Sequence, residues 1–231
     1  MRNQGLMVKA ESTEFQRFAD SDGGGGRGGI SSAAAAMKDR FELQLRDGTP
    51  VILRPLLEED RPMVAEAYRR LSPEARYQRF WTRTGEMIGD TMLDRLIEQD
   101  PAKHATWVVL DPAREFPGVG GASWWRDAAL PEEVEISLMV LDDDQNRGIG
   151  TLLLAAMWLT AFRSGVEKMS AHVLTDNRRA ANWMRDCGGQ GEWDGYKLTF
   201  RWNLCDLDCL PVTRAAVDLA SWLAELSPII L

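Results

Sequence analysis

One short stretch of this 231-residue chain restricts its fold more than any other. Residues 144–151 read Asp-Gln-Asn-Arg-Gly-Ile-Gly-Thr and connect two apolar segments whose hydrophobic patterns differ. Residues 134–140 alternate as a β-strand does, whereas residues 152–162 are apolar over a helical length. A strand, a loop with two glycines and a helix bring unpaired backbone N–H groups and the positive end of a helix dipole to one point. The stretch therefore predicts a binding site for an anion, most often phosphate.

Two other phosphate-binding loops do not fit these residues. A P-loop ends in Gly-Lys-Ser or Gly-Lys-Thr, which the chain lacks. The dinucleotide-binding fingerprint requires a third glycine, and Leu153 stands at that place. What remains, Gln145-x-x-Gly148-x-Gly150, resembles the acyl-CoA pyrophosphate loop of the GNAT superfamily of N-acetyltransferases. The alternative is an ordinary tight turn from a strand into a helix.

Two further segments strengthen this resemblance. Residues 53–60 are similar to the Arg-Pro-x-x-x-x-Asp opening of the superfamily, with Arg54, Pro55 and Asp60 at the matching places. Residues 71–80 resemble a Leu-Ser-Pro-Glu-Ser-x-Tyr-x-Arg-Phe segment of bacterial protein-lysine acetyltransferases of the Pat type. The resemblance covers roughly residues 40–205.

The segment at residues 71–80 also has a simpler interpretation. Taken one by one, Arg76 and Arg79 are expected to solvate one face of a helix, while Tyr77 and Phe80 pack inward. For any single residue of the segment, this structural role is expected before a functional one.

The chain divides into three predicted parts. Residues 1–38, rich in glycine and alanine, form a low-complexity tail that is predicted to be disordered. Residues 39–205 form the predicted N-acetyltransferase domain. Residues 206–231 form an amphipathic helical extension, whose apolar stripe is predicted to pack on the domain. The alternative for this stripe is a homodimer contact. Its members are Val212, Ala215, Ala216, Leu219, Trp222, Leu223 and Leu226.

The order of predicted elements defines a fold class. A hairpin turns at Asp47-Gly48, and Ser72-Pro73 starts a helix. Strands are predicted at residues 41–46, 51–54, 106–110, 119–125, 133–140, 168–174, 191–194 and 197–202. Helices are predicted at residues 58–71, at residues 89–99 and at residues 177–187, with one more that starts at Pro73 and one that follows the glycine loop. This order predicts an α+β, or mixed α/β, protein, and the GNAT resemblance implies a central mixed β-sheet flanked by helices on both faces.

Glu135 is the candidate catalytic residue. In the strand at 133–140, Val134, Ile136 and the other even positions face one side, and Glu133 and Glu135 face the other. A carboxylate beneath a covering helix would be desolvated at a cost of several kcal/mol, so the Glu135 face is expected to line a polar cleft. The alternative is a solvated carboxylate on an exposed strand. The resemblance implies that Glu135 is the general base.

The resemblance also implies acetyl-CoA as the cosubstrate and assigns residues to it. They are the backbone N–H groups of Leu138, Met139 and Val140 for the pantetheine arm and the charge that develops on the thioester carbonyl oxygen, Gln145, Asn146, Arg147, Gly148, Ile149, Gly150 and Thr151 for the pyrophosphate, and Asn177 for a further hydrogen bond. Arg147 is either a charge partner of the phosphates or a solvated loop residue. Asn177 is also a natural helix N-cap, and the two roles can coexist.

The chain departs from the family pattern at two positions. Met184 stands where many members have a tyrosine that protonates the departing thiolate, and Gly189 stands where phenylalanine is usual. Pat-type enzymes commonly lack that tyrosine, so the first departure leaves the general acid unassigned without removing the assignment to the family.

Composition excludes several classes of partner. A net charge of −8 opposes nucleic-acid binding and favours cationic partners such as amines and lysine side chains. No apolar segment reaches the roughly 18 residues that span a bilayer, and there is no signal peptide, so a cytoplasmic protein without membrane contact is expected. Cys187, Cys205 and Cys209, with only two histidines in the chain, indicate neither a disulfide framework nor a metal site.

These features lead to one functional hypothesis with alternatives. The chain is predicted to be an acetyl-CoA-dependent N-acetyltransferase acting on a primary amine, with a protein lysine favoured, for example on an acyl-CoA synthetase. The alternatives are a small-molecule amine acetyltransferase, a non-catalytic acyl-CoA-binding module, and an adaptor that uses the C-terminal helix.

Overall fold

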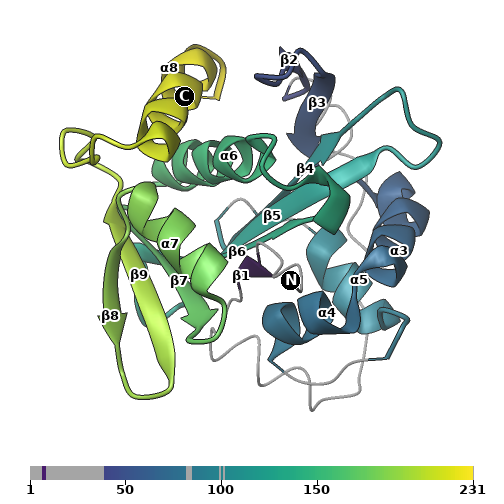
Figure 1. Ribbon diagram of the computed structural model, residues 1–231, viewed down its shortest axis with the longest axis horizontal. Coiled ribbons are helices and arrows are strands. Elements are labelled where there is room, and N and C mark those ends of the chain that lie inside the picture. Colours follow the sequence, from purple (N-terminus) through teal and green to yellow (C-terminus); the bar gives the residue numbers. More distant parts are fainter. Residues whose placement is uncertain (1–6, 9–38, 82–84, 99, 101, 231) are drawn as a thin grey trace.

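The computed structural model describes residues 7–8, 39–81, 85–98, 100 and 102–230. In this part of the chain nine strands form one sheet, in the order β2-β3-β4-β5-β6-β7-β9-β8, with β1 paired to β6 off this path (Figure 1). The strands are β1 (Met7–Val8), β2 (Phe41–Gln44), β3 (Pro50–Pro55), β4 (His104–Leu110), β5 (Gly118–Arg126), β6 (Glu133–Val140), β7 (Lys168–Leu174), β8 (Gln190–Trp193) and β9 (Lys197–Asn203). Among these strands only β6 and β7 pair in parallel, so the predicted mixed sheet is confirmed.

Helices cover the sheet on both faces, as predicted. They are η1 (Glu58–Asp60), α3 (Arg61–Arg70), α4 (Pro73–Phe80), α5 (Asp90–Ile97), η2 (Asp142–Asp144), α6 (Ile149–Arg163), α7 (Arg178–Asp186) and α8 (Arg214–Ile230). Figure 1 shows α3, α4 and α5 grouped at one side of the central strands and α6, α7 and α8 at the other. The first group forms two small apolar clusters against β4 and Leu141, whereas the second group forms the main core.

Helix α6 is the centre of the main core. It packs against β4, β5 and β6 on one side and α8 on the other, and Ile149 to Ala161 are all buried. This double covering is why its sequence is apolar all round rather than along one stripe. A Cβ atom on Gly120 of β5 would come within 3.0 Å of the Ile149 side chain, so glycine there lets α6 lie close to the sheet.

The two family motifs before α5 have local structural causes. Arg54 at the end of β3 donates to both carboxylate oxygens of Asp60, at 2.6 and 2.7 Å, which fixes the entry into α3. Ser72 accepts a hydrogen bond from the Ala75 N–H at 3.1 Å, and Pro73 occupies the first position of α4.

Strands β6 and β7 separate along their length. They pair only where Glu133 to Glu135 lie beside Lys168 to Ser170. Farther along, β1 takes the place beside β6, with Met7 opposite Met139 and Val8 opposite Leu138. The predicted tail at residues 1–38 lies outside the described residues except for this strand.

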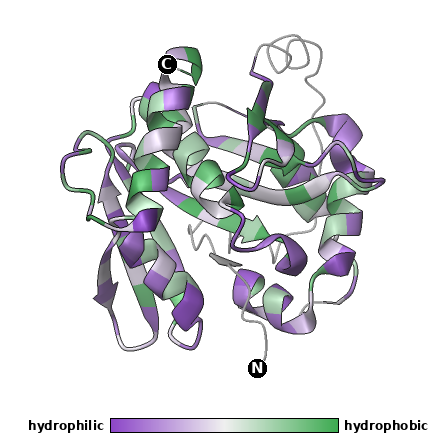
Figure 2. Ribbon diagram, turned by 45° about the horizontal axis from the view of Figure 1, so that its top comes forward, coloured by the Kyte–Doolittle hydropathy of each residue, from purple (hydrophilic) through white to green (hydrophobic). Residues whose placement is uncertain are grey.

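The C-terminal stripe packs on the domain within the same chain. In Figure 2 the ribbon of α8 alternates between hydrophobic and hydrophilic colours, and its buried side contacts α6. Leu219, Trp222, Leu223 and Leu226 join the main core. Val212, which we expected in the stripe, precedes the helix and is fully exposed.

Candidate functional site

Glu135 lies on an interior strand of the sheet, between β5 and β7. Val134 and Ile136 are buried beneath α6, whereas the Glu135 side chain is 11% exposed on the opposite face. Its neighbours in the sheet are Trp125 on β5 and Ser170 on β7. The carboxylate is therefore neither on an edge strand nor turned into bulk water.

His172 on β7 is an ionisable neighbour of Glu135. Its Nε2 atom lies 3.8 Å from Glu135 Oε1, and its Nδ1 atom lies 3.0 Å from the Thr199 hydroxyl. The imidazole is held between the two groups. We did not predict this contact. The signal was available, because His172 follows Ser170 by two residues and so faces the same side of the sheet.

Arg79 approaches the same carboxylate from α4. The expectation that Arg76 and Arg79 solvate a helix face is wrong: both are 6% exposed, whereas Tyr77 is 39% exposed. Burial lowers the pKa of Arg79 to about 10, against an opposing attraction from Glu135, so the side chain remains a cation at neutral pH. Its Nη1 atom is buried without a hydrogen-bond partner among the described residues.

The mouth of α6 has the geometry of an anion site. Gly148 caps the helix with a φ of 91°, and Asn146 before it has a φ of 66°, so both residues adopt the left-handed conformation. The first N–H groups of the 15-residue helix α6 have no partners within it, and no side chain from the described ranges caps them.

A cavity of about 500 Å³ lies in front of these N–H groups, so side chains do not plug the helix mouth. Its walls include Gly148, Gly150, Thr151, Arg46, Arg179 and Arg214. The three arginines come from the hairpin, α7 and α8, and we did not predict them. Because they are far apart in the sequence, no single motif contains them. Asp186 and Asp218 also line the cavity, and Arg46 is paired with Asp218 at 2.7 Å. The helix N-terminus, the two glycines and the cations Arg179 and Arg214 are the groups suited to a diphosphate.

The loop side chains have distinct contacts. Arg147, expected as a phosphate partner or a solvated residue, donates to Asp144 at 2.6 Å and to Asp47 at 2.9 Å. Gln145 donates to the Val140 carbonyl at 3.3 Å, and its own Oε1 is buried without a partner in the described part of the chain. Asn146 accepts a hydrogen bond from Arg179.

The remaining loop candidates differ in what they offer. Ile149 is 1% exposed, so only its backbone can reach a ligand. Thr151 is also buried and accepts a long hydrogen bond from Trp183 Nε1 at 3.4 Å.

The strand that was assigned to the pantetheine arm, β6, is partly covered by β1. Leu138 and Val140 bury their side chains beneath α6, whereas Met139 faces the opposite side. Beside the backbone of Leu138 and Met139 lies β1. A ligand arm can therefore run along this edge of β6 only when β1 leaves it.

Asn177 and the two departures from the family pattern have structural explanations. Asn177 caps α7 by accepting from the Ala180 N–H at 3.1 Å, and it donates to Gln78 of α4 at 3.2 Å. Met184 is fully buried in the main core. A Cβ atom at Gly189 would approach the Trp202 ring to 2.6 Å, so that indole fills the space of the usual phenylalanine.

Two other kinds of site are absent from the described residues. No group of three or more His, Cys, Asp or Glu side chains there is arranged to hold a metal ion. No helix in the same ranges combines the length and the apolar composition needed to cross a bilayer.

Comparison with known proteins identifies this architecture. The model of the acetyltransferase (GNAT) domain family matches residues 51–190. Acetyltransferase Pat of Mycolicibacterium smegmatis is 32% identical over 160 residues, covering 66% of this chain and 47% of that protein. The chain thus spans about half the length of that relative. An acetyltransferase of Pseudomonas aeruginosa is 32% identical over 168 residues, covering 71% of this chain and 88% of its own.

Solved structures agree on the fold. The GNAT domain of S. lividans PAT superposes with a TM-score of 0.65 at 20% identity, covering 71% of this chain and 96% of that one. The structure of yncA from Salmonella typhimurium with its cofactor acetyl-CoA has a TM-score of 0.53 at 20% identity, covering 67% of this chain and 94% of that one. The resemblance noted in the sequence is confirmed at the level of the family and the fold.

Proposed function

The chain belongs to the GNAT acetyltransferase family, and on that basis we propose that it moves an acetyl group from acetyl-CoA to a primary amine, with Glu135 as the general base. The observation that carries this assignment is the position of Glu135 on β6, where its side chain is only 11% exposed, ten residues before Gln145 of the two-glycine loop. The mouth of α6 holds the diphosphate in this proposal, and the arm runs along β6 towards the carboxylate.

A base is needed because the nucleophile is protonated at neutral pH. A lysine amine with a pKa of about 10.4 is neutral at pH 7 in only about four molecules in ten thousand, which costs roughly 4.6 kcal/mol. A carboxylate within reach of the amine, directly or through one water, takes up that proton. His172 at 3.8 Å and the Arg79 charge are the groups that orient and balance Glu135.

A cationic acceptor fits the rim of this site. Asp194, at the turn between β8 and β9, interacts electrostatically with His172. Near the same turn, Tyr196 packs edge-on against Trp81 at 5.9 Å, and the Lys197 ammonium lies 6.0 Å from the Trp81 ring. A carboxylate and aromatic rings attract ammonium groups. Together with the Pat-type segment at residues 71–80, this favours a protein lysine, for example on an acyl-CoA synthetase, over a small amine.

The experiment is transfer from labelled acetyl-CoA to a panel of acyl-CoA synthetases and small amines. We expect transfer to a lysine of one or more of the proteins above the rate without enzyme. Transfer to small amines alone would favour the small-molecule alternative. CoA binding without transfer to any acceptor would favour a binding module.

A further inference from the structure

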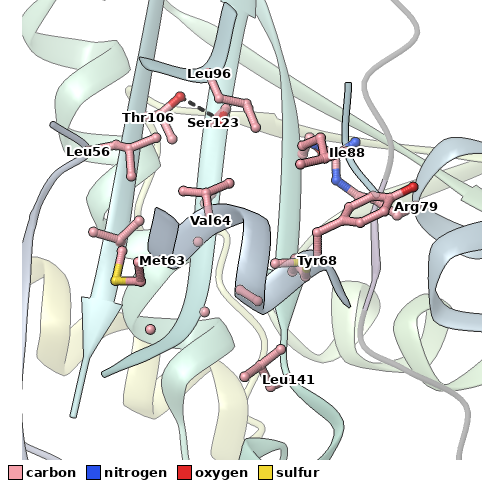
Figure 3. A pocket seen from close by; sticks show the side chains of 18 of the residues that line it. Leu56, Met63, Val64, Tyr68, Arg79, Ile88, Leu96, Thr106, Ser123 and Leu141 are labelled. Atoms are coloured by element: carbon pink, nitrogen blue, oxygen red, sulfur yellow. Dashed lines mark hydrogen bonds between the residues drawn. The ribbon is translucent and has the colours of Figure 1, made fainter. Parts of the chain in front are cut away.

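A second cavity, separate from the mouth of α6, lies on the Glu135 face of the sheet beneath α3. It measures about 90 Å³, and Figure 3 shows it between Met63, Val64 and Tyr68 of α3 and the strand residues Thr106 and Ser123. Most of its lining side chains are apolar, and apolar cavities bind apolar ligands. The cavity is therefore a candidate binding site for hydrocarbon.

Along β6, the cavity lining begins at Ser137, two residues after the proposed base Glu135. Successive residues on one face of a strand are about 7 Å apart, so Ser137 and Met139 follow Glu135 along β6 on the same side. Both residues line the cavity. Opposite Met139 on β5 is Gly121, where a Cβ atom would find only two atoms of the described residues within 4 Å, at 3.5 and 3.6 Å. Glycine at this position helps to leave the space open.

The polar groups on the floor are occupied by one another. The Glu98 carbonyl can only accept, so His104 Nδ1 donates to it at 3.1 Å, and Nε2 must accept from the Thr106 hydroxyl at 2.9 Å. Thr106 in turn accepts from Ser123 at 2.8 Å. The hydroxyl protons of Thr106 and Ser123 are therefore committed within the protein.

Unlike the hydroxyl groups of Thr106 and Ser123, Arg79 on the cavity wall has a hydrogen-bond donor that is not satisfied by the described residues. It lines the cavity, its Nη1 atom has no acceptor within the described ranges, and it is coupled electrostatically to Glu135. An unsatisfied buried N–H donor is costly, and a ligand oxygen would satisfy it. The wall thus combines one donor close to the base with an apolar space beyond it.

We propose that this cavity receives the alkyl chain of the acyl group, with Arg79 donating to the thioester carbonyl, so that the protein transfers acyl groups of about four carbons as well as acetyl. A 150 Å³ apolar cavity holds benzene, so 90 Å³ has room for about four carbon atoms. The inference rests on the proposed function. The ammonium first gives one proton to Glu135. The neutral amine then attacks, the C–S bond breaks as the C–N bond forms, and the second N–H proton leaves to water, which protonates the departing thiolate.

The test compares acetyl-, butyryl-, hexanoyl- and succinyl-CoA with one amine acceptor. We expect kcat/KM for butyryl-CoA within about tenfold of that for acetyl-CoA, and a clear fall at hexanoyl-CoA. Gly121→Val fills the cavity from the sheet, because its backbone is outside the left-handed region and the added Cβ meets only ordinary contacts. It should lower butyryl transfer about tenfold or more while acetyl transfer is maintained.

Two further variants keep the test decisive. Val64→Phe fills the same cavity from α3 and replaces Gly121→Val if that variant does not fold. Ala220→Val adds bulk on the exposed side of α8, at a residue that does not line the cavity, and should change neither donor.

Each outcome separates the two proposals. Transfer of acetyl alone, or equal loss of acetyl and butyryl transfer in both filled variants, overturns the acyl-chain site while the proposed function stands. A preference for succinyl-CoA that Arg79→Gln abolishes also overturns it, because Arg79 would then bind a terminal carboxylate. Absence of transfer from every donor overturns the proposed function itself.

Discussion

Glu135 Oε1 lies 3.8 Å from His172 Nε2, across the short parallel pairing of β6 with β7. The imidazole is fixed from its other side by Thr199, so it can hold the carboxylate in one orientation. This arrangement makes His172 a positioning residue for the proposed base.

Replacing His172 therefore has a graded effect. We expect His172→Ala to lower kcat about tenfold with little change in KM for acetyl-CoA, and His172→Gln to retain more activity because its amide can still reach Glu135. Thr199→Val, which frees the ring without removing it, should lie between the wild type and His172→Ala. Equal losses in both His172 variants, or a loss in KM alone, would assign His172 a structural role only.

A substitution at Gly148, which caps α6, should affect both backbone strain and ligand binding. A side chain at Gly148 must adopt a φ of 91°, which costs about 1–2 kcal/mol, and it adds bulk at the helix mouth. Gly148→Ala should therefore lower both the unfolding free energy and the affinity for CoA, measured by calorimetry.

Gly165 provides a matched control for this measurement. Its φ is 77°, and a Cβ atom there would meet no atom of the described residues within 4 Å, but it follows the far end of α6. Gly165→Ala should lose similar stability and keep the CoA affinity. If both variants lost affinity equally, the mouth of α6 would not be the diphosphate site.

The pairing of β1 with β6 predicts competition with the cosubstrate. Met7 and Val8 lie beside the Leu138 and Met139 backbone that the pantetheine arm uses in the proposed function. When only a fraction of the molecules is in the binding-competent state, the apparent dissociation constant is the intrinsic constant divided by that fraction. Val8→Pro weakens the pairing and should tighten CoA binding several-fold in the full chain.

A proline elsewhere in the same segment tests whether this effect is local. Glu14→Pro lies outside β1 and should leave CoA affinity unchanged. A synthetic peptide of residues 1–12 should compete with CoA for the Val8→Pro variant. Unchanged CoA affinity in Val8→Pro would show that β1 does not oppose binding.

His104 makes stability depend on pH. Burial lowers its pKa to about 4, against about 6.5 for an unfolded histidine, so between these values the unfolded chain binds more protons than the folded one. The unfolding free energy should therefore fall as the pH drops from about 6.5 to about 4, by a few kcal/mol at most. Below pH 4 this contribution is constant.

Urea unfolding at several pH values measures this effect. The slope in that range should be smaller in His104→Gln, which has no titrating group at this position, than in the wild type. Equal slopes would mean that His104 is protonated in the folded protein at these pH values.

Much of the fold could be predicted from local sequence. The strand periods, the Asp47-Gly48 turn and the Ser72-Pro73 helix start all follow from short-range rules, and each lies where expected. The apolar run of α6 also fixed the centre of the core. The pairing of β1 with β6 could not be predicted, because no rule of period or turn chemistry brings Met7 to Met139.

The site was less predictable because its parts come from distant segments. Arg46, Arg179 and Arg214 meet only through the packing of the hairpin and α8 around α6. Arg79 contradicts the rule that charged residues of an amphipathic helix face water. Such a violation is expected where a protein buries charge for function rather than stability.

The measurement that tests the account most directly is the pair of acetyl-transfer rate and CoA affinity in Glu135→Gln, with Glu133→Gln on the same face of β6 as the control. We predict that Glu135→Gln lowers kcat about 100-fold or more while the CoA dissociation constant stays within twofold, and that Glu133→Gln changes neither. A Glu135→Gln protein that transfers acetyl groups at the wild-type rate would contradict the account.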